Sequence, residues 1–498
     1  MTTPPAGSTG PSLRSRALLA VTLTVGFYAL ALAISLGLIA APIVLFTVSG
    51  RGNIWIALAL IGAGIAILRA IVPPRDRFEP PGPELRPAEH PRLHSVLQDV
   101  AIKTGQAPAD TVYLDLDMNA SVLEHRGRRL MLLGLPLLAT LSVDELRAVV
   151  AHEYGHYVGG DTRFAGWIWR TRHAVLRTVH DLATAESGFR RNFVRWPFQW
   201  YAQLFLRITN AISRRQEFAA DRLSARVASP EAAGSALRRL EALAPVYPRY
   251  WASDVVPMLD ARKRPPLADG FYDLASHSAI APALDEIVKT DIEGNEADPY
   301  ASHPTLRQRL EALGAPMVTT APGPAERPAT ELLENLPALE RQLLIDRFGE
   351  EVGSYEVADW SAAADIHLAR IRETAERFGP AFGADLTIES AGRAVANRAA
   401  WRQALRDCLP PEDRDAPEDV MDDVALNAIF AVVVTEAVDA GASVSARPGE
   451  EITLGLGDKA LEPWTVLAAI GAGDRSAEAW SSEPLVAELT AARSQPRA

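Results

Sequence analysis

Residues 142–161 of the chain read S-V-D-E-L-R-A-V-V-A-H-E-Y-G-H-Y-V-G-G-D, and this stretch has the features of one well-marked helix. Ser142 can cap the N-terminus, and Glu145, three residues later, completes a capping box. Apolar residues recur at helical spacing and predict a buried face; they are Val143, Leu146, Val149 and Val150. Gly159 and Gly160 supply the left-handed conformation at which a helix commonly ends.

The middle of this helix holds an H-E-x-x-H motif, formed by His152, Glu153 and His156. Two histidines four residues apart project from the same side of a helix, with Cβ atoms roughly 5–6 Å apart. Both rings can therefore reach one metal ion at about 2.0–2.1 Å. Glu153 can face a metal-bound water as a base. The alternative is two surface histidines, which the capped, amphipathic context disfavours.

A second acidic pair follows in S-R-R-Q-E-F-A-A-D, residues 213–221. Glu217 and Asp221 are four residues apart and share one helix face. Glu217 can complete a His-His-Glu zinc set and leave the fourth position for water. Asp221 can orient a ligand histidine through a hydrogen bond. Alone, an E-x-x-x-D spacing is typical of a solvated helix face. Here the pair follows the H-E-x-x-H motif by about 60 residues, and this combination makes the metal interpretation more specific.

From about Leu93 to Leu313 the chain resembles the HtpX and CAAX-prenyl-protease type of integral-membrane zinc metallopeptidases, which are gluzincins. The resemblance depends on Asn119-Ala120, H-E-Y-G-H at 152–156, the stretch 213–221, and Ser302-His303-Pro304 followed by Arg309. It implies one Zn²⁺ per chain, held by His152, His156 and Glu217, with Glu153 as general base and Asp221 orienting a ligand histidine.

The resemblance also implies a mostly helical catalytic domain whose small β-element forms the substrate edge, with Asn119 and Ala120 as substrate-binding residues. His303 is expected near the cleft, where it would help to stabilise the oxyanion. The alternative for His303 is a helix cap before Pro304, which suits a first-turn position.

The chain departs from this family in its membrane segments. It shows two clear spans, which are too few for the closed membrane cage of the CAAX proteases. HtpX-type proteins also have a hydrophobic pair between the two motif halves, and here a basic, aromatic stretch takes its place. A prenyl-protein substrate is therefore disfavoured, and we expect a bacterial quality-control or signalling peptidase.

The N-terminal region predicts a membrane hairpin. Residues 1–16 are polar and are expected to be disordered. Residues 17–48 are apolar and uncharged, too long for a signal-peptide core of about 7–15 residues, and Pro42 should end or bend this span. Residues 54–72 form a second span of about the minimum length. The alternative is a buried hairpin in a soluble protein.

Positive charge flanks the hairpin on both sides, at Arg14, Arg16, Arg69, Arg75 and Arg77, with Arg51 alone between the spans. The positive-inside rule therefore places both termini and the catalytic domain in the cytoplasm. Residues 161–216 are rich in Arg and Trp, which suits the headgroup layer of an anionic membrane. RNA binding and a packed helical pair are the alternatives, and 196–212 is apolar enough to insert.

The composition limits the possible partners. The chain has 498 residues and a net charge of −12, which argues against nucleic-acid binding. Cys408 is the single cysteine, so a disulfide framework is excluded. We expect a protein or peptide substrate and a lipid bilayer as partners.

The predicted fold is mainly α, with a membrane hairpin, a zincin-like helical domain with a small β-element, and a C-terminal α+β domain. Strands are expected at 111–114 and 130–133, joined through a turn at 126–128, and an edge strand there could hold an extended peptide. The predicted segments are 1–16, 17–72, a linker at 73–91, a metallopeptidase domain at 92–316 and a C-terminal domain at 329–498.

The C-terminal domain carries no chemical motif. Residues 425–438 are expected to form a buried helix, and residues 444–456 a hairpin around Pro448-Gly449. The sequence thus predicts a membrane-anchored zinc metalloendopeptidase. A membrane scaffold or binding protein with a vestigial site is the alternative from another class, and a zinc hydrolase of non-peptide bonds is the second rival.

Overall fold

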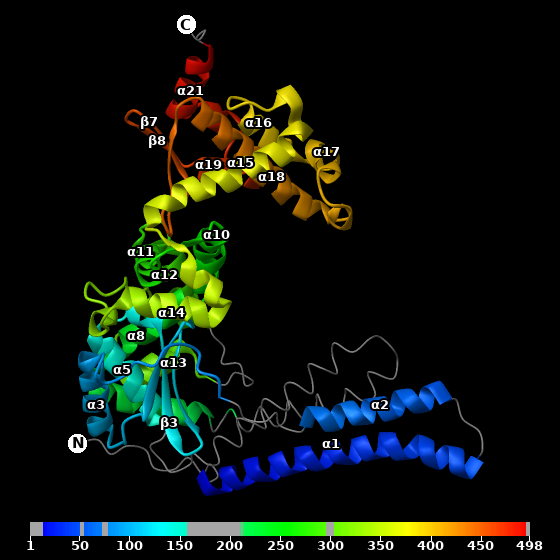
Figure 1. Cartoon of the computed structure of the whole chain (residues 1–498), viewed down its shortest axis with the longest axis vertical. Coiled ribbons are helices and arrows are strands. Elements are labelled where there is room, and N and C mark those ends of the chain that lie inside the picture. Colours follow the sequence, from blue (N-terminus) through cyan, green and yellow to red (C-terminus); the bar gives the residue numbers. More distant parts are fainter. Residues whose placement is uncertain are drawn as a thin grey trace.

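The structure is a computed structural model that describes residues 13–49, 54–71, 78–156, 210, 213–294 and 303–494. It is mainly helical, as predicted, with three small sheets among the described residues. Two hydrophobic cores are present: one contains buried residues from Leu85 to Ala363, and the other contains buried residues from Ile371 to Leu489. Figure 1 shows the second core as a separate lobe, farthest from the N-terminal helices.

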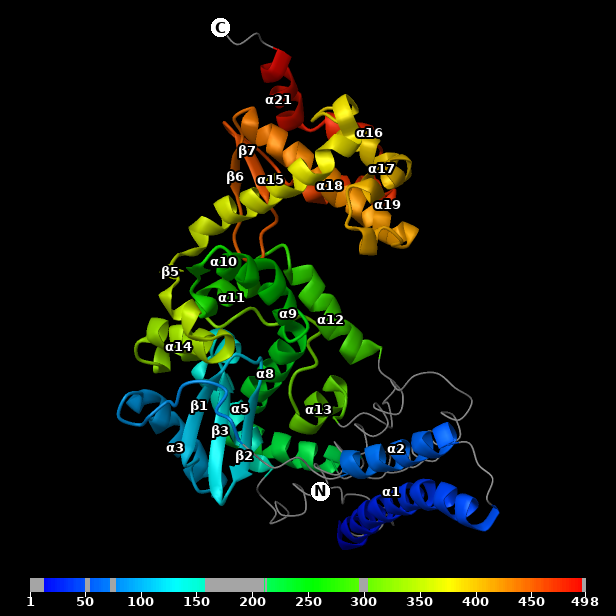
Figure 2. The same cartoon turned by 45° about the vertical axis from the view of Figure 1, so that its right-hand side comes forward.

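Helices α1 (Leu13–Ser49) and α2 (Ile54–Ile71) pack side by side (Figures 1 and 2). Gly64 permits the close approach, because a Cβ there would lie 2.8 Å from the Ser35 carbonyl oxygen. Helix α1 continues through Pro42 and does not end there. Among the described helices, one stretch, Val25–Val48, is long and apolar enough to cross a membrane, and the apolar part of α2 is shorter.

A three-stranded sheet lies beside the motif helix. Its strands are β1 (Thr111–Asp115), β2 (Ala120–His125) and β3 (Arg128–Gly134), in the order β1-β3-β2. Strand β3 is parallel to β1 and antiparallel to β2. The sequence analysis did not predict β2, because this strand is mostly half-buried and includes Ser, Glu and His, so that it lacks a clear apolar alternation.

Helix α5 (Val143–Gly155) carries the H-E-x-x-H motif and is anchored at its N-terminus. The predicted capping box is confirmed: the Glu145 amide donates to Ser142 Oγ at 3.2 Å, and the Ser142 amide donates to Glu145 Oε2 at 2.8 Å. The other carboxylate oxygen of Glu145 accepts a hydrogen bond from buried Arg239 at 3.0 Å. Glu145 therefore ties the start of α5 to α8 (Pro230–Leu243).

Helices surround the sheet and α5. They are α3 (Pro91–Thr104), α4 (Leu135–Thr140), α9 (Tyr247–Tyr250), α10 (Val256–Asp260), α11 (Leu267–Ser276), α12 (Ala281–Glu293), α13 (Leu306–Leu313) and α14 (Leu336–Phe348), together with the π-helical turn Trp251–Val255. The two-residue strands β4 (Lys263–Arg264) and β5 (Glu356–Val357) pair in parallel.

The Pro-rich stretch 319–328 runs along the first core. The Ala325 amide donates to the Thr140 carbonyl at 2.9 Å, and the Ala329 amide donates to the Leu141 carbonyl at 2.7 Å. Leu343, Leu344 and Trp360 are also buried in this core. This stretch therefore braces the junction between α4 and α5.

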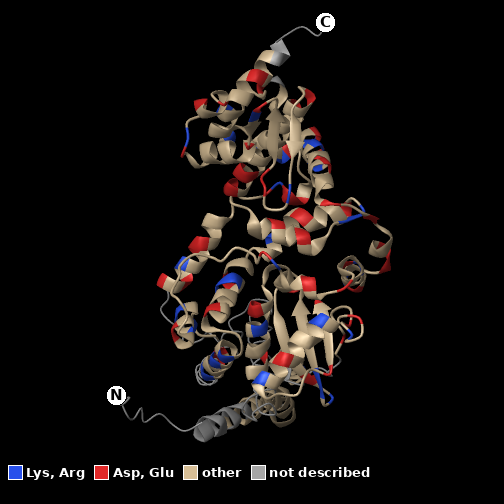
Figure 3. Cartoon of the chain, turned by 90° about the vertical axis from the view of Figure 1, so that its left-hand side faces the viewer, with Lys and Arg blue, Asp and Glu red and all other residues tan. Residues whose placement is uncertain are grey.

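The second core lies among α15 (Ala363–Phe382), α16 (Ala391–Ala396), α17 (Arg402–Asp407), α18 (Glu418–Asp439), α19 (Pro463–Ala472), α20 (Glu478–Ser481) and α21 (Pro484–Ser494). Strands β6 (Ser443–Ser445) and β7 (Thr453–Leu456) confirm the predicted hairpin, and β8 (Lys459–Leu461) extends it. Helix α18 is a core helix, as predicted, since Ile429, Val433 and Val434 are fully buried. Acidic side chains are frequent on this lobe (Figure 3).

Candidate metal centre

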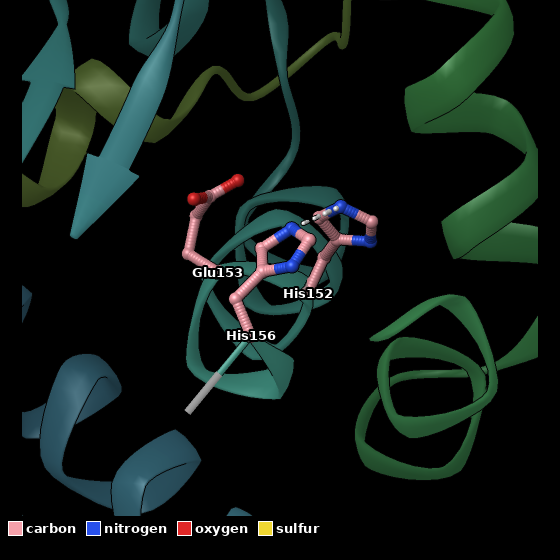
Figure 4. A group of neighbouring side chains, drawn as sticks. All are labelled: His152, Glu153 and His156. Carbon is pink, nitrogen blue, oxygen red and sulfur yellow. Dashed lines mark hydrogen bonds between the residues drawn. The ribbon is translucent and has the colours of Figure 1, made fainter. Parts of the chain in front are cut away.

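The two motif histidines lie on one side of α5, one turn apart, with His152 inside the helix and His156 at its C-cap. Their Nε2 atoms are 3.2 Å apart, and their rings meet edge to face with centroids 4.9 Å apart. Figure 4 shows both imidazoles above the helix, with the Glu153 side chain extending beside them. Candidate ligand atoms of His152, Glu153 and His156 all lie within 4.8 Å of one another.

Glu217 comes from a separate helix, residues 213–227, and its carboxylate reaches the same point. Glu217 Oε2 lies 3.5 Å from His152 Nε2, and Oε1 lies 3.9 Å from His156 Nε2. The carboxylate is buried, and Oε2 has no hydrogen-bond partner among the described residues. A buried carboxylate oxygen without a donor is costly, so this atom is suited to bind a cation.

The spacing of these atoms fits one zinc ion. Two ligands at about 2.0–2.1 Å from a tetrahedral ion are separated by about 3.3–3.4 Å. Two of the pairs are close to this, at 3.2 Å and 3.5 Å, and the third, from His156 Nε2 to Glu217 Oε1, is longer at 3.9 Å. Glu153 also lies nearby, but consecutive residues point about 100° apart around a helix. Glu217 is therefore the better third ligand, and Glu153 can face a water molecule at the fourth position.

Asp221 and Arg309 fix the orientation of His152. Asp221 Oδ1 lies 2.9 Å from His152 Nδ1, which places the ring proton on Nδ1 and leaves the lone pair of Nε2 for a metal. Arg309 of α13 donates two hydrogen bonds to Asp221, from Nη2 to Oδ1 at 2.6 Å and from Nε to Oδ2 at 2.9 Å. Arg309 Nη2 also lies 3.7 Å from Glu217 Oε2.

These contacts shift the pKa values of the residues involved. Burial raises the pKa of Glu217, but the nearby His152, His303 and Arg309 outweigh it and hold the pKa well below its usual range. Burial likewise raises the pKa of Asp221, and His152 and Arg309 lower it below its ordinary value. Both groups are therefore carboxylates at neutral pH, the ionisation state that metal binding requires.

The two histidines have opposite pKa shifts. Burial lowers the pKa of His152, whereas hydrogen bonds to Asp221 and Glu217 raise it, to about 9, so a metal ion must displace the Nε2 proton of His152 when it binds. Burial and the positive charge of His152 lower the pKa of His156 to about 4. His156 is thus neutral at physiological pH and can offer its lone pair without losing a proton.

Burial raises the pKa of Glu153 to about 7, and the nearby His152 lowers it by less than burial raises it. A carboxyl group with a pKa near neutrality can both accept and donate a proton in one reaction cycle. Its geometry and its pKa therefore suit an acid–base role.

The structure places His303 at the site as well. Its Nδ1 lies 3.2 Å from Glu217 Oε1, and its side chain is 65% exposed. His303 does not cap the following helix, because Thr305 forms the capping box of α13. The role of His303 toward an oxyanion stays a prediction.

Asn119 and Ala120 stand at the start of β2, the strand that packs against α5. The Asn119 carbonyl accepts a hydrogen bond from the Gly134 amide at 2.8 Å, which closes the antiparallel ladder. Their substrate-binding role stays a prediction. Gly159, Gly160, Ser302 and the basic, aromatic residues 161–209 lie outside the described residues.

Sequence reasoning gave Arg309 no role, although it contacts three of the site residues. Nothing in the local pattern of α13 distinguishes this Arg from Arg307, which donates to the Ile292 carbonyl. Only the fold brings Arg309 to Asp221, 88 residues earlier in the chain.

Comparison with known proteins identifies this region. A model of peptidase family M48 matches residues 87–317, which include every described side chain of the site. No curated protein and no solved structure gives a significant match to the chain. Residues 87–317 are therefore similar to the M48 metallopeptidases, which is consistent with the HtpX and CAAX-protease type expected from the motifs.

Proposed function

We propose that this protein is a membrane-anchored zinc metalloendopeptidase. The observation that carries the proposal is the meeting of two imidazoles and a buried carboxylate at tetrahedral spacing, with Glu217 Oε2 lacking any donor among the described residues. Asp221 orients His152, and Arg309 in turn holds Asp221.

When bound by His152, His156 and Glu217, zinc would polarise the scissile carbonyl and make a water molecule more acidic. Glu153 then accepts a proton from the water as its oxygen bonds to the carbonyl carbon. The protonated Glu153 passes this proton to the amine nitrogen as the C–N bond breaks. A pKa of about 7 lets the same carboxyl group do both. His303, exposed beside Glu217, is suited to stabilise the negative oxygen.

The membrane arrangement that we propose is a two-span hairpin of α1 and α2. The length of Val25–Val48 and the close packing around Gly64 support it. Arginines on both outer flanks favour cytoplasmic termini and a cytoplasmic catalytic domain. The acidic C-terminal lobe lies away from α1 and α2 (Figure 2) and would not be drawn to an anionic membrane.

The proposed substrate is a protein or peptide, bound in extended form along the β-element beside α5. Bacterial protein quality control or signalling is the role that we favour. Net negative charge argues against nucleic acid as a partner.

A digestion assay on the purified full chain in detergent tests the proposal. Wild type should cleave casein, lose this activity with EDTA and regain it with zinc. Glu153→Gln should keep the zinc and lose cleavage by about 10²–10⁴-fold. Cleavage by Glu153→Gln at the wild-type rate would refute the role of Glu153, and zinc binding by wild type without any cleavage would favour a silent binding protein.

A further inference from the structure

The helix that carries Glu217 touches α5 at a glycine inside the H-E-x-x-H motif. A Cβ atom on Gly155 would lie 2.7 Å from Ala220 Cα and 2.8 Å from Ala220 Cβ. These are backbone and Cβ atoms, so no side-chain rotation can relieve the overlap. Only a glycine at 155 allows the two helices to approach this closely.

The contact lies next to the ligands on both helices. Gly155 precedes His156 by one residue, and Ala220 follows Glu217 by three residues. The distance between the helices at this point therefore sets how far Glu217 stands from the imidazoles. Its oxygens now lie 3.5 Å and 3.9 Å from the two Nε2 atoms.

A hydrogen bond fastens the same two helices farther along. Ser224 Oγ donates to the Ala148 carbonyl at 2.7 Å, and the Ser224 side chain is buried. Ala148 precedes Gly155 by seven residues, and Ser224 follows Ala220 by four, so the two contacts lie along one antiparallel seam. The steric contact sets the separation, and the hydrogen bond sets the register.

The tolerance of a metal site makes this separation important. Ordinary carbon–carbon contact requires about 3.5–4.0 Å, so a methyl group at 155 would push the helices apart locally by roughly 1 Å. Metal–ligand distances tolerate only about 0.2 Å. The full displacement would exceed the tolerance by about fivefold, and it would still exceed it if half were absorbed elsewhere.

We propose that Gly155 and Ala220 form a positioning contact that sets the distance between the Glu217 carboxylate and the histidine pair, with Ser224 holding the register. The inference rests on the proposed zinc site. Gly155 itself touches neither substrate nor metal and acts through the placement of Glu217.

The test measures zinc affinity by competition with a chromogenic chelator, and the visible spectrum of the Co²⁺-loaded protein, which reports coordination geometry. Gly155→Ala should weaken zinc binding at least tenfold and change the cobalt spectrum. Ala220→Gly, added to Gly155→Ala, should restore only part of both, because it removes the Ala220 Cβ at 2.8 Å but leaves the Ala220 Cα at 2.7 Å. Ser224→Ala should weaken zinc binding severalfold without adding any atom.

Gly270 offers a matched control. A Cβ there would lie 2.3 Å from the Trp360 ring, yet Gly270 is on α11 and away from the ligand helices. Gly270→Ala should lower the melting temperature and leave zinc affinity and the cobalt spectrum unchanged. If Gly155→Ala does not fold, Ser224→Ala and Ala220→Gly/Gly155→Ala carry the test.

The outcomes separate the two proposals. The positioning contact would be overturned, and the zinc site left standing, if Gly155→Ala kept wild-type zinc affinity and an unchanged cobalt spectrum. If Gly155→Ala does not fold, the same result in Ser224→Ala would overturn it. A wild-type protein that binds neither zinc nor cobalt would overturn the zinc site itself. Equal loss of zinc affinity in Gly155→Ala and Gly270→Ala would show a general loss of stability and also overturn the positioning contact.

Discussion

Asp221→Asn should damage both the stability of the peptidase domain and its affinity for zinc. Asp221 is 2% exposed on its side chain and accepts from His152 Nδ1 and from two nitrogens of Arg309. An asparagine can turn its carbonyl oxygen toward His152, but its amide group then faces the Arg309 Nε–H, donor against donor. The Arg309 charge, 16% exposed, would lose the closer of its two carboxylate partners.

The size of both effects follows from these contacts. Removing one partner of a buried ion pair costs about 3–5 kcal/mol, and we expect the lower end because Glu217 remains 3.7 Å from Arg309. A loss of about 3 kcal/mol in a domain of this size corresponds to roughly 6–12 °C in melting temperature. Loss of the carboxylate behind a metal-bound histidine typically weakens metal binding about 10–100-fold.

Thermal unfolding of the metal-free full chain, and zinc competition with a chelator, measure the two effects. The matched control is Asp144→Asn on the same helix as His152. Asp144 pairs with Arg147 at 2.8 Å but is 73% exposed, so its loss should cost less than about 0.5 kcal/mol. An Asp221→Asn protein that melts like the control and binds zinc within twofold of wild type would refute the role assigned to Asp221.

Three further changes test other parts of the structure. Ser142→Ala removes the cap of α5 and should lower the free energy of unfolding by about 1 kcal/mol, measured by denaturant titration; an unchanged midpoint would contradict the capping box. Burial raises the pKa of Glu340 to about 7 even though the Ala268 amide donates to it. Folding therefore favours protonated Glu340, and this contribution is complete below about pH 4.5 and is lost as the pH rises through 7. Glu340→Gln should melt at the wild-type temperature near pH 4.5 and at a higher temperature than wild type at pH 8, where its free energy of unfolding should be larger by up to about 3 kcal/mol. If variant and wild type melt alike at both pH values, the raised pKa is contradicted. His303→Ala should lower kcat more than zinc affinity, and parallel loss of both would argue against a role in transition-state stabilisation.

The local sequence was sufficient to predict α5. Ser142, Glu145 and the apolar spacing predicted its start and its buried face, and the structure has the capping box in both directions. The spacing of His152 and His156 also predicted two rings on one side, since that follows from helix geometry alone. These features depend on residues within four positions of one another, which is why they can be read from the sequence.

Contacts between distant segments could not be read in this way. Arg309 reaches Asp221 only because α13 folds back against α8, and the resemblance named the residue without giving its partner. The role of Gly155 depends on Ala220, 65 positions later, so the motif alone gives no sign of it. Strand β2 was missed because tertiary packing, and not side-chain pattern, decides its conformation.

The Pro-rich stretch 319–328 shows the same limit. Its composition is typical of a boundary between domains, yet its amides and those just after it bond to the Thr140 and Leu141 carbonyls. Proline content predicts an extended chain, but it does not predict whether the chain crosses solvent or lies against a folded surface.

Zinc stoichiometry and zinc K-edge X-ray absorption on the purified full chain test the central claim most directly. We expect one zinc per chain, with two imidazole nitrogens and oxygen ligands at about 2.0–2.1 Å. Glu217→Gln should lower the occupancy, and Glu153→Gln should not. A protein that takes up no zinc, or that holds zinc equally well after loss of the Glu217 carboxylate, would contradict the proposed metal centre.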